Sequence, residues 1–401
     1  MGKINLWQEE AIEADGSTTV SVTIERPDQA RSQLWYRVPS EHRSLITQSC
    51  DPFVVATIFE AMTQATDVEV HGQVSPSLLQ NLAEFQAAWS CWRPSWYKQI
   101  EITAEVEQEP LNIQPSDKAI AAFSGGVDSC FTMFRHRSGR CGRVQRNIKA
   151  GLMVHGFDIP LEQKEAFDRA AEKSKAMLAS LGVELIAIAT NFRELKQDWE
   201  DAHGTGIASC LMLFQKGYGA GIIASSDPYD ALNLPYGSNP VSDWLLSSKA
   251  FQIVHDGASF NRLEKIREIV NWPEALKNLR VCWEGSQKDR NCGRCEKCIR
   301  NILVFRVLGL GLPPCFDQDV TDAQILSLKN LKKSQLIELD PILATAQANG
   351  LSDSWVTALD ECITQYRRVD TLKEFKDLVK KRLSPTQLKV LRKLRHTLPL
   401  P

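Results

Sequence analysis

Residues 119–131 read AIAAFSGGVDSCF, and this stretch decides the fold of the chain. Residues 119–123 form an apolar run typical of a strand buried on both faces, and Ser124-Gly125-Gly126 predicts a tight turn after it. Asp128 and Ser129 suit the first turn of a helix, where free N–H groups and the positive end of the dipole lie. We therefore expect an anion cradle; the alternative is an ordinary Gly-Gly turn before a core helix.

Outward from this stretch, strands and helices alternate from Lys118 onward, which indicates an α/β fold with a doubly wound parallel sheet. Further strands are expected at 150–157, 183–189, 220–226 and 252–254, with helices at 162–181 and 204–217. Ligands of such folds bind beyond the carboxyl ends of the strands, at a switch point in strand order. Small or polar residues follow several of these strands, at 124–129, 155–158, 190–191 and 225–227.

Three domains are expected: an α+β accessory domain at 1–116, an ATP-binding domain at 117–316 and a helical region at 317–401. In the first domain, apolar alternation at 20–24, 68–70 and 100–102 predicts half-buried antiparallel strands, and helices are expected at 52–62 and 75–89. Trp89, Trp92 and Trp96 are interpreted as core residues, with base stacking or partner binding as the alternative. The basic residues at 373–395 either pack on the protein itself or bind nucleic acid or an acidic partner.

Composition points to an ordinary globular protein: 401 residues, 43% hydrophobic, 24% charged, with a net charge of -2. This balance argues against general nucleic-acid binding, and the N-terminus shows no secretion signal. No stretch approaches the length of a membrane span, so a cytoplasmic protein without a membrane partner is expected. Eleven cysteines without a signal peptide favour thiols and metal ligands over disulfides.

Four cysteines, Cys282, Cys292, Cys295 and Cys298, follow the spacing C-x9-C-x2-C-x2-C. The tight C-x2-C-x2-C turn brings three sulfurs onto one ion, and the preceding cysteine closes a tetrahedral site. Zinc is the expected ion, and an iron–sulfur cluster is the alternative. A closed site of four cysteines predicts a structural role.

The hexapeptide SGGVDS at 124–129 resembles the PP-loop of the N-type ATP pyrophosphatases. Together with the cysteine spacing, it resembles the QueC family of 7-cyano-7-deazaguanine synthases over residues 118 to about 315. The added terminal regions are similar to those of QueC-like proteins in anti-phage defence operons. The resemblance implies ATP, Mg²⁺ and Zn²⁺ as cofactors, with Asp128, near Mg²⁺, and Ser129 as catalytic residues. The implied ATP-binding residues are Phe123, Ser124, Gly125, Gly126, Val127, Asp128, Ser129, Val154, Phe157 and Arg262.

The chain departs from that family in its substrate region. The segment SSDPYDALNLPYGSNPVSDW replaces an acidic segment ending in Asp-Cys-Arg, and His203-Gly204-Thr205 replaces an expected Arg-Asn pair. Arg262 stands where a phosphate-contacting lysine is usual. The candidate substrate contacts are Asp227, Tyr229 and Asp243, with Asp230, Asn239 and Lys249 as further candidates; the alternative for each is a loop-stabilising role.

The resemblance implies an ATP-dependent ligase that adenylates a carboxylate, of a 7-deazaguanine, and releases pyrophosphate. The adenylate then reacts with a nitrogen nucleophile to give an amide or nitrile; in the defence-related proteins the acceptor is a candidate protein amine. A protein partner and a homodimer are compatible with this reading, whereas a nucleic-acid partner has weaker support. Two alternatives remain: an RNA-thiolating PP-loop enzyme, and a non-catalytic nucleotide-binding subunit of a defence complex.

Overall fold

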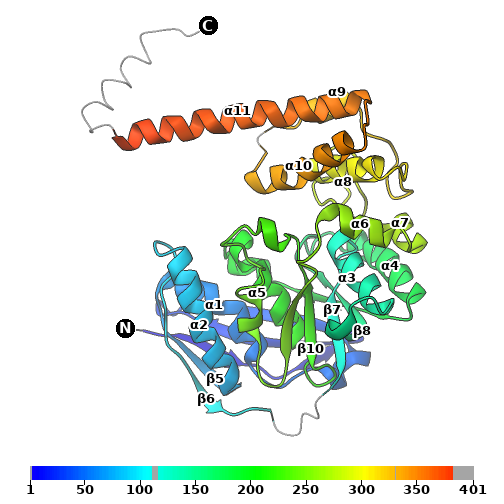
Figure 1. Cartoon of the computed structure of the whole chain (residues 1–401). Helices are drawn as coiled ribbons and strands as arrows, with labels where there is room; N and C mark the ends of the chain where they lie inside the picture. Colours follow the sequence, from blue (N-terminus) through cyan, green and yellow to red (C-terminus); the bar gives the residue numbers. More distant parts are fainter. Residues whose placement is uncertain (1, 111–115, 330, 383–401) are drawn as a thin grey trace. The chain divides into compact units, whose positions relative to one another are not determined.

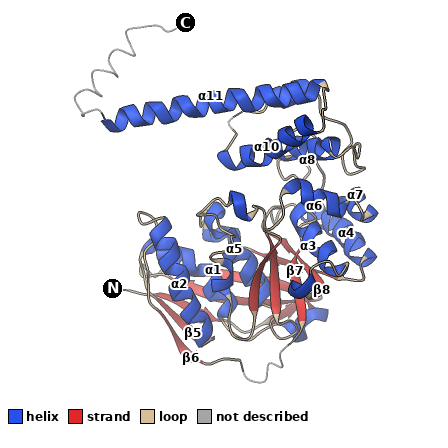
Figure 2. Ribbon diagram, viewed as in Figure 1, coloured by secondary structure: helices blue, strands red, loops and turns tan. Residues whose placement is uncertain are grey.

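The computed structural model describes residues 2–110, 116–329 and 331–382. Its contacts divide the chain into two compact units, Met1–Gln318 and Asp319–Pro401. The first unit is built around one mostly parallel sheet of 11 strands flanked by helices (Figures 1 and 2). The expected α/β class is therefore confirmed.

The strands of the sheet are β1 (Ile4–Gln8), β2 (Ile12–Ala14), β3 (Ser17–Glu25), β4 (Arg31–Pro39), β5 (Val68–Val74), β6 (Ile102–Glu107), β7 (Lys118–Ala122), β8 (Asn147–His155), β9 (Glu184–Thr190), β10 (Ala220–Ala224) and β11 (Gln252–Asp256). The α-helices of the first unit are α1 (Asp51–Gln64), α2 (Pro76–Trp92), α3 (Val127–Arg137), α4 (Lys164–Ser180), α5 (Trp199–Met212), α6 (Arg262–Ile269), α7 (Pro273–Asn278) and α8 (Glu296–Val307). The strand order is β11-β10-β7-β8-β9-β4-β3-β1-β5-β6, with β2 paired to β3.

Strand β7 marks the switch point of the parallel region. From β7 the chain winds outward through β8 to β9, and it then returns to place β10 on the other side of β7. Helices α3 and α4 pack on β7, β8 and β9, while α5, on the return path, packs on β7 and β10. Right-handed crossovers put helices from the two winding directions on opposite faces, which is the doubly wound arrangement. The loop after β7 thus lies where a ligand crevice is expected.

The N-terminal strands continue this sheet. Strand β4 pairs antiparallel with β9, with Tyr36 opposite Thr190. The Asn191 side chain strengthens the junction, because its Oδ1 accepts from the N–H of Trp35 at 3.0 Å and its Nδ2 donates to the carbonyl of Gln33 at 2.8 Å. The predicted boundary at residue 116 therefore falls inside one compact unit, whereas the division found after Gln318 lies close to the one predicted at 317.

The antiparallel pairing predicted for the N-terminal strands is right for β3 with β4 and wrong for β5 and β6. Strand β5 pairs parallel with both β1 and β6. The reason is topological: a helix connects β5 to β6 and lets the chain return in the same direction. Apolar alternation is the same for both kinds of half-buried strand, so the sequence pattern does not separate them.

The accessory region has an aromatic core. Trp89 is fully buried and meets Phe59 edge-on at a centroid distance of 4.7 Å, with Phe85 and Tyr97 beside them. Trp92 packs partly buried against this core, whereas Trp96 is 53% exposed. The prediction of core tryptophans is confirmed for Trp89 and wrong for Trp96.

The second unit is helical, as expected, with α9 (Asp322–Leu326), α10 (Lys333–Ala348) and α11 (Ser354–Arg382). Helices α10 and α11 pack through buried residues such as Leu339 and Leu359, and Arg367 pairs with Asp340 at 2.9 Å. Residues 111–115 and the end of the basic segment, 383–395, lie outside the described residues. Among the residues that are described, no helix is long and apolar enough to cross a membrane.

Candidate functional site

The loop between β7 and α3 has the conformation expected of an anion cradle. Gly125 has a φ of 74°, a region that favours glycine, and its carbonyl accepts from the N–H of Arg280 at 2.8 Å. Helical pairing begins with the N–H of Cys130 bonding to the carbonyl of Gly126, so the N–H groups of the preceding first turn lie at the open end of the helix. Ser129 Oγ donates to the same Gly126 carbonyl at 3.1 Å. The loop therefore leads directly into the N-terminal end of α3, where the first-turn N–H groups and the positive end of the helix dipole favour an anion.

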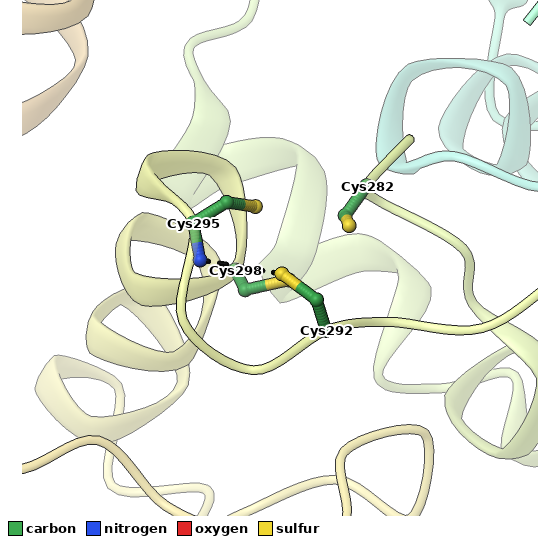
Figure 3. A group of neighbouring side chains, drawn as sticks. All are labelled: Cys282, Cys292, Cys295 and Cys298. Carbon is green, nitrogen blue, oxygen red and sulfur yellow. Dashed lines mark hydrogen bonds between the residues drawn. The ribbon is translucent and has the colours of Figure 1, made fainter. Parts of the chain in front are cut away.

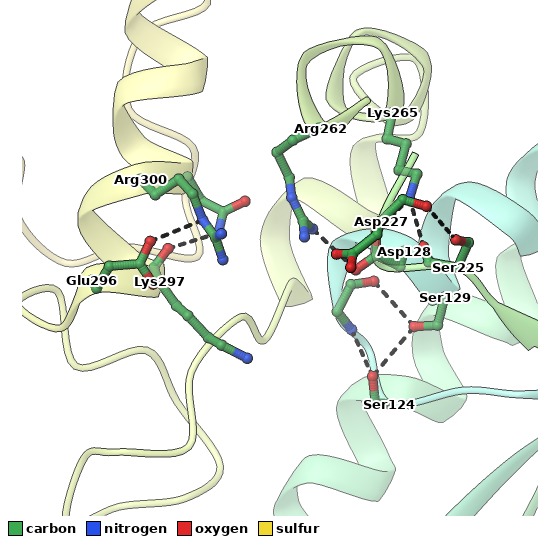
Figure 4. A network of polar contacts seen from close by, with 12 residues as sticks. Ser124, Asp128, Ser129, Ser225, Asp227, Arg262, Lys265, Glu296, Lys297 and Arg300 are labelled. Atoms are coloured by element: carbon green, nitrogen blue, oxygen red, sulfur yellow. Dashed lines mark hydrogen bonds and ion pairs between the residues drawn. The ribbon is translucent and has the colours of Figure 1, made fainter. Parts of the chain in front are cut away.

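Two cations hold Asp128 at the start of α3 (Figure 4). Lys265 Nζ lies 2.8 Å from Oδ1 and Arg262 Nη1 lies 3.1 Å from Oδ2, both from helix α6. Lys265 is almost fully buried and also donates to the carbonyl of Ser225 at 2.6 Å. Burial acts to raise the pKa of Asp128, but the charges of Arg262 and Lys265 outweigh it and keep this pKa below its usual value.

The two ion pairs of Asp128 affect how its carboxylate could interact with Mg²⁺. Each carboxylate oxygen of Asp128 faces one cation, so part of its acceptor capacity is taken, and the position near Mg²⁺ that the family resemblance implies stays a prediction. What Asp128 does in this geometry is orient α6 and its two cations beside the loop.

A cavity of about 390 Å³ lies over the carboxyl ends of β7, β8 and β10. Phe123, Ser124, Asp128 and Ser129 line one part of it, as do Val154 and Phe157 from the end of β8 and the residues just after it. Further lining residues come from α5 and from the segment after β10: Trp199, Glu200, His203, Tyr236 and Ser238. The cavity thus combines a mostly apolar interior with polar groups at its walls, as small-molecule sites do.

A smaller cavity of about 110 Å³ adjoins it, and the two share Ser124, Asp128, Asp158, Arg280, Trp283 and Lys297. Its wall carries four cations, Arg262, Arg280, Lys297 and Arg300, against two carboxylates. Figure 4 shows Lys297 and Arg300 on α8, across from the loop and from Arg262. Burial, followed by the charges of Arg300 and Arg262, lowers the pKa of Lys297 to about 8. An excess of positive charge in a small enclosed space favours an anion such as a phosphate chain.

The four cysteines lie together, as predicted (Figure 3). Their sulfur atoms all lie within 4.8 Å of one another, and those of Cys292 and Cys298 are 3.9 Å apart. A tetrahedral zinc site with bonds of about 2.3 Å separates its sulfurs by about 3.8 Å, so this group could hold a metal ion such as zinc. A cubane cluster, in which each thiolate binds a different iron, needs sulfurs farther apart than one ion does, so the observed spread favours a single ion.

The cysteine group is connected to the cavities through short stretches of chain. Cys282 lines the smaller cavity, and Trp283 lines both. On the other side of the group, Lys297 lies between Cys295 and Cys298 in sequence, and its Nζ sits 3.0 Å from the Trp283 ring centroid. Asn291 joins the two ends of the intervening loop by bonding to the carbonyl of Leu279 and to the N–H of Val281. A metal here would fix the position of cavity-lining side chains while doing no chemistry itself.

The structure brings most of the predicted ATP-binding residues to these two cavities. Of that set, every member except Gly125 lines one or both, and Gly125 shapes the turn. The substrate candidates are placed differently. Tyr229 is 58% exposed, and the buried Asp243 carboxylate binds His255 Nδ1 at 2.8 Å and Ser238 Oγ at 2.7 Å. Neither they nor Asp227 line the described cavities, although Asp227 belongs to the network of polar contacts drawn in Figure 4.

Sequence reasoning missed several cavity residues. Arg280, Trp283 and Lys297 line the cavities, and no motif in the sequence predicts a ligand contact for them. Lys265, a cation in the middle of the amphipathic helix α6, gave no sign that it would be buried against Asp128. Searches against protein-family models, curated proteins and solved structures found no match to this chain.

Proposed function

We propose that this chain is a QueC-like, ATP-dependent, AMP-forming ligase that joins a carboxylate to a nitrogen nucleophile. One observation carries the proposal: the loop expected to bind ATP lies at the switch point of the sheet, between a mostly apolar cavity and a strongly cationic one. The larger cavity suits an adenosine and a planar acid, and the smaller one suits phosphates.

The chemical logic follows from the charges. A carboxylate oxygen is a poor leaving group, and its attack on an α-phosphate brings two anions together. Cations at the loop, among them Arg262, Arg280 and Lys297, would offset this repulsion and stabilise the departing pyrophosphate. Alignment of the acid with the α-phosphate would supply much of the remaining rate acceleration. Mg²⁺, as part of the proposal, would arrive bound to the phosphates of ATP.

The zinc site belongs to the proposal as a structural element. Zinc bound by Cys282, Cys292, Cys295 and Cys298 would hold Trp283 and Lys297 at the junction of the two cavities. A 7-deazaguanine carboxylate remains the first substrate to test, and the acceptor is ammonia or a protein amine.

The test measures nucleotide turnover by the purified full-length protein with a 7-deazaguanine 7-carboxylate and ammonium. AMP and pyrophosphate, resolved from ADP and phosphate, should appear only when the carboxylate is present. Asp128→Ala should abolish turnover, because it releases both cations from the loop. The matched control is Asp340→Ala, which removes a carboxylate paired to Arg367 in the second unit and should leave turnover intact.

Other outcomes would point elsewhere. Turnover that requires RNA in place of the carboxylate would favour a thiolation-type enzyme. ATP binding without turnover by any carboxylate would favour a non-catalytic nucleotide-binding subunit.

A further inference from the structure

His203 occupies a distinctive place in the wall of the larger cavity. It lies in the first half of α5, next to Tyr236, whose ring centroid is 4.7 Å from that of the imidazole. Two glycines set this position: a Cβ on Gly204 would come within 2.0 Å of the Gly237 carbonyl oxygen, and one on Gly237 would come within 2.5 Å of His203 Nδ1. The imidazole is therefore held in a fixed place by close packing of backbone.

The hydrogen bonds of His203 define which nitrogen carries the proton. Nδ1 lies 3.1 Å from the carbonyl oxygen of Trp199, and a carbonyl only accepts, so Nδ1 bears the hydrogen. Nε2 then has a free lone pair. The imidazole also has a backbone hydrogen bond with Glu200, whose carbonyl oxygen lies beside Nδ1 next to Gly237. With Nδ1 turned toward the helix backbone, Nε2 is the nitrogen left to face the cavity.

We propose that His203 is the base that takes a proton from the nitrogen nucleophile when the adenylate is converted to an amide. This inference rests on the proposed function and adds a residue to it. The neighbouring groups support the choice. Asp128 and Asp158 face cations, Glu200 has a partner of its own, and burial raises the pKa of Tyr236 to about 12, which leaves it protonated. Burial also lowers the pKa of His203, so its imidazole is neutral at pH 7 and keeps the Nε2 lone pair.

The reaction needs such a group, because ammonium and primary amines are protonated at neutral pH and carry no lone pair. Nε2 removes one proton, and the freed nitrogen lone pair attacks the acyl carbon. A C–N bond forms, the C–O bond to AMP breaks, and AMP leaves with the electron pair. The second nitrogen proton passes to water as the amide forms, and the imidazolium returns its proton to solvent.

His203→Asn tests the proposal, because the asparagine amide N–H can replace Nδ1–H toward the Trp199 carbonyl while Nε2 is lost. Two steps are measured separately with the full-length protein. Carboxylate-dependent exchange of pyrophosphate into ATP reports adenylation, using a 7-deazaguanine 7-carboxylate. Amide formation is then followed with ammonium and with hydroxylamine, which is already neutral at pH 7. His42→Asn, at a buried histidine in the 3₁₀ turn Ser40–Leu45, is the matched control.

We expect His203→Asn to keep exchange, to lose roughly 10²- to 10⁴-fold in rate with ammonium, and to react with hydroxylamine nearly as fast as wild type. His42→Asn should behave as wild type in all three assays. Equal losses with both nucleophiles would overturn the proposal, because a structural role does not distinguish them. Loss of exchange would overturn it too, since it would place His203 in adenylation. If wild type itself shows no exchange, the proposed function fails and this inference fails with it.

Discussion

Replacing Asp128 by asparagine should destabilise the first unit by leaving a buried ammonium group without its counter-ion. Lys265 is 1% exposed, and removing one partner of a buried pair costs about 3–5 kcal/mol. Two features reduce this cost: the Asp128 side chain is 24% exposed, and Lys265 keeps its hydrogen bond to the Ser225 carbonyl. We therefore expect a loss of about 2–3 kcal/mol in the free energy of unfolding.

The expected change in melting temperature follows from the size of the unit. An unfolding entropy of about 2.1 cal/mol/K per residue gives roughly 0.7 kcal/mol/K over Met1–Gln318. Asp128→Asn should then lower Tm by about 3–4 °C, measured by circular dichroism at pH 7. The matched exposed pair provides the control: Asp340→Asn should cost at most about 1 kcal/mol, because both partners lie in solvent.

The pH dependence of this difference has a defined sign. The pKa of Asp128 is lower in the folded chain than its unfolded value of about 3.9. Its contribution to stability is therefore fully present above the unfolded pKa and is lost as pH falls through the folded pKa. The Tm difference between wild type and Asp128→Asn should be constant from about pH 6 to 8 and should shrink below about pH 4.

A double-mutant cycle with Lys265→Met separates this effect from a general disturbance of the loop. The double variant removes both charges and should lose less than the two single changes added together, with a coupling of about 1–2 kcal/mol. A cycle with no coupling, or a Tm shift below about 1 °C for Asp128→Asn, would refute the reasoning.

Three further predictions concern the metal, the glycine contact and the aromatic core. Metal analysis should find one zinc and no iron per chain. Cys298→Ser should lower the zinc content and also weaken nucleotide binding, measured by titration with a fluorescent ATP analogue. Full loss of zinc with unchanged nucleotide affinity would contradict the link between the cysteine group and the cavities through Trp283 and Lys297. Gly204→Ala should destabilise the unit by more than about 2 kcal/mol in denaturant unfolding, because its Cβ would lie 2.0 Å from the Gly237 carbonyl oxygen. Trp89→Ala should lower the free energy of unfolding by about 3–5 kcal/mol, whereas Trp96→Ala, at a 53% exposed position, should change it by less than about 1 kcal/mol. Similar losses for the two variants would show that both tryptophans belong to one core.

Much of the fold could be predicted because it follows from local signals. The apolar run before Ser124 forms β7, the glycines form the turn, and α3 begins at Val127 as expected. The strands predicted at 150–157, 183–189, 220–226 and 252–254 correspond to β8, β9, β10 and β11 within a few residues. In each case the neighbouring residues along the chain carry the information, since strand burial and helix termination are set within one or two turns.

The partnership of β4 with β9 could not be predicted in this way. Strand pairing between distant segments depends on which edge is free once the sheet has formed, and no local pattern records it. The same holds for the parallel pairing of β5, which a half-buried alternating strand adopts as readily as the antiparallel one.

The residues of the candidate site fall into the same two groups: those that a local sequence pattern predicts and those that only tertiary packing brings together. The sequence by itself determined the loop at 124–129 and the four cysteines, because a turn and a chelate are built from residues close together in the chain. Only the tertiary structure decided that Lys265 meets Asp128, that Arg280 and Lys297 line the cationic cavity, and that His203 faces the larger one. These contacts join segments far apart in sequence, and they depend on how the helices pack on the sheet, which no single segment specifies.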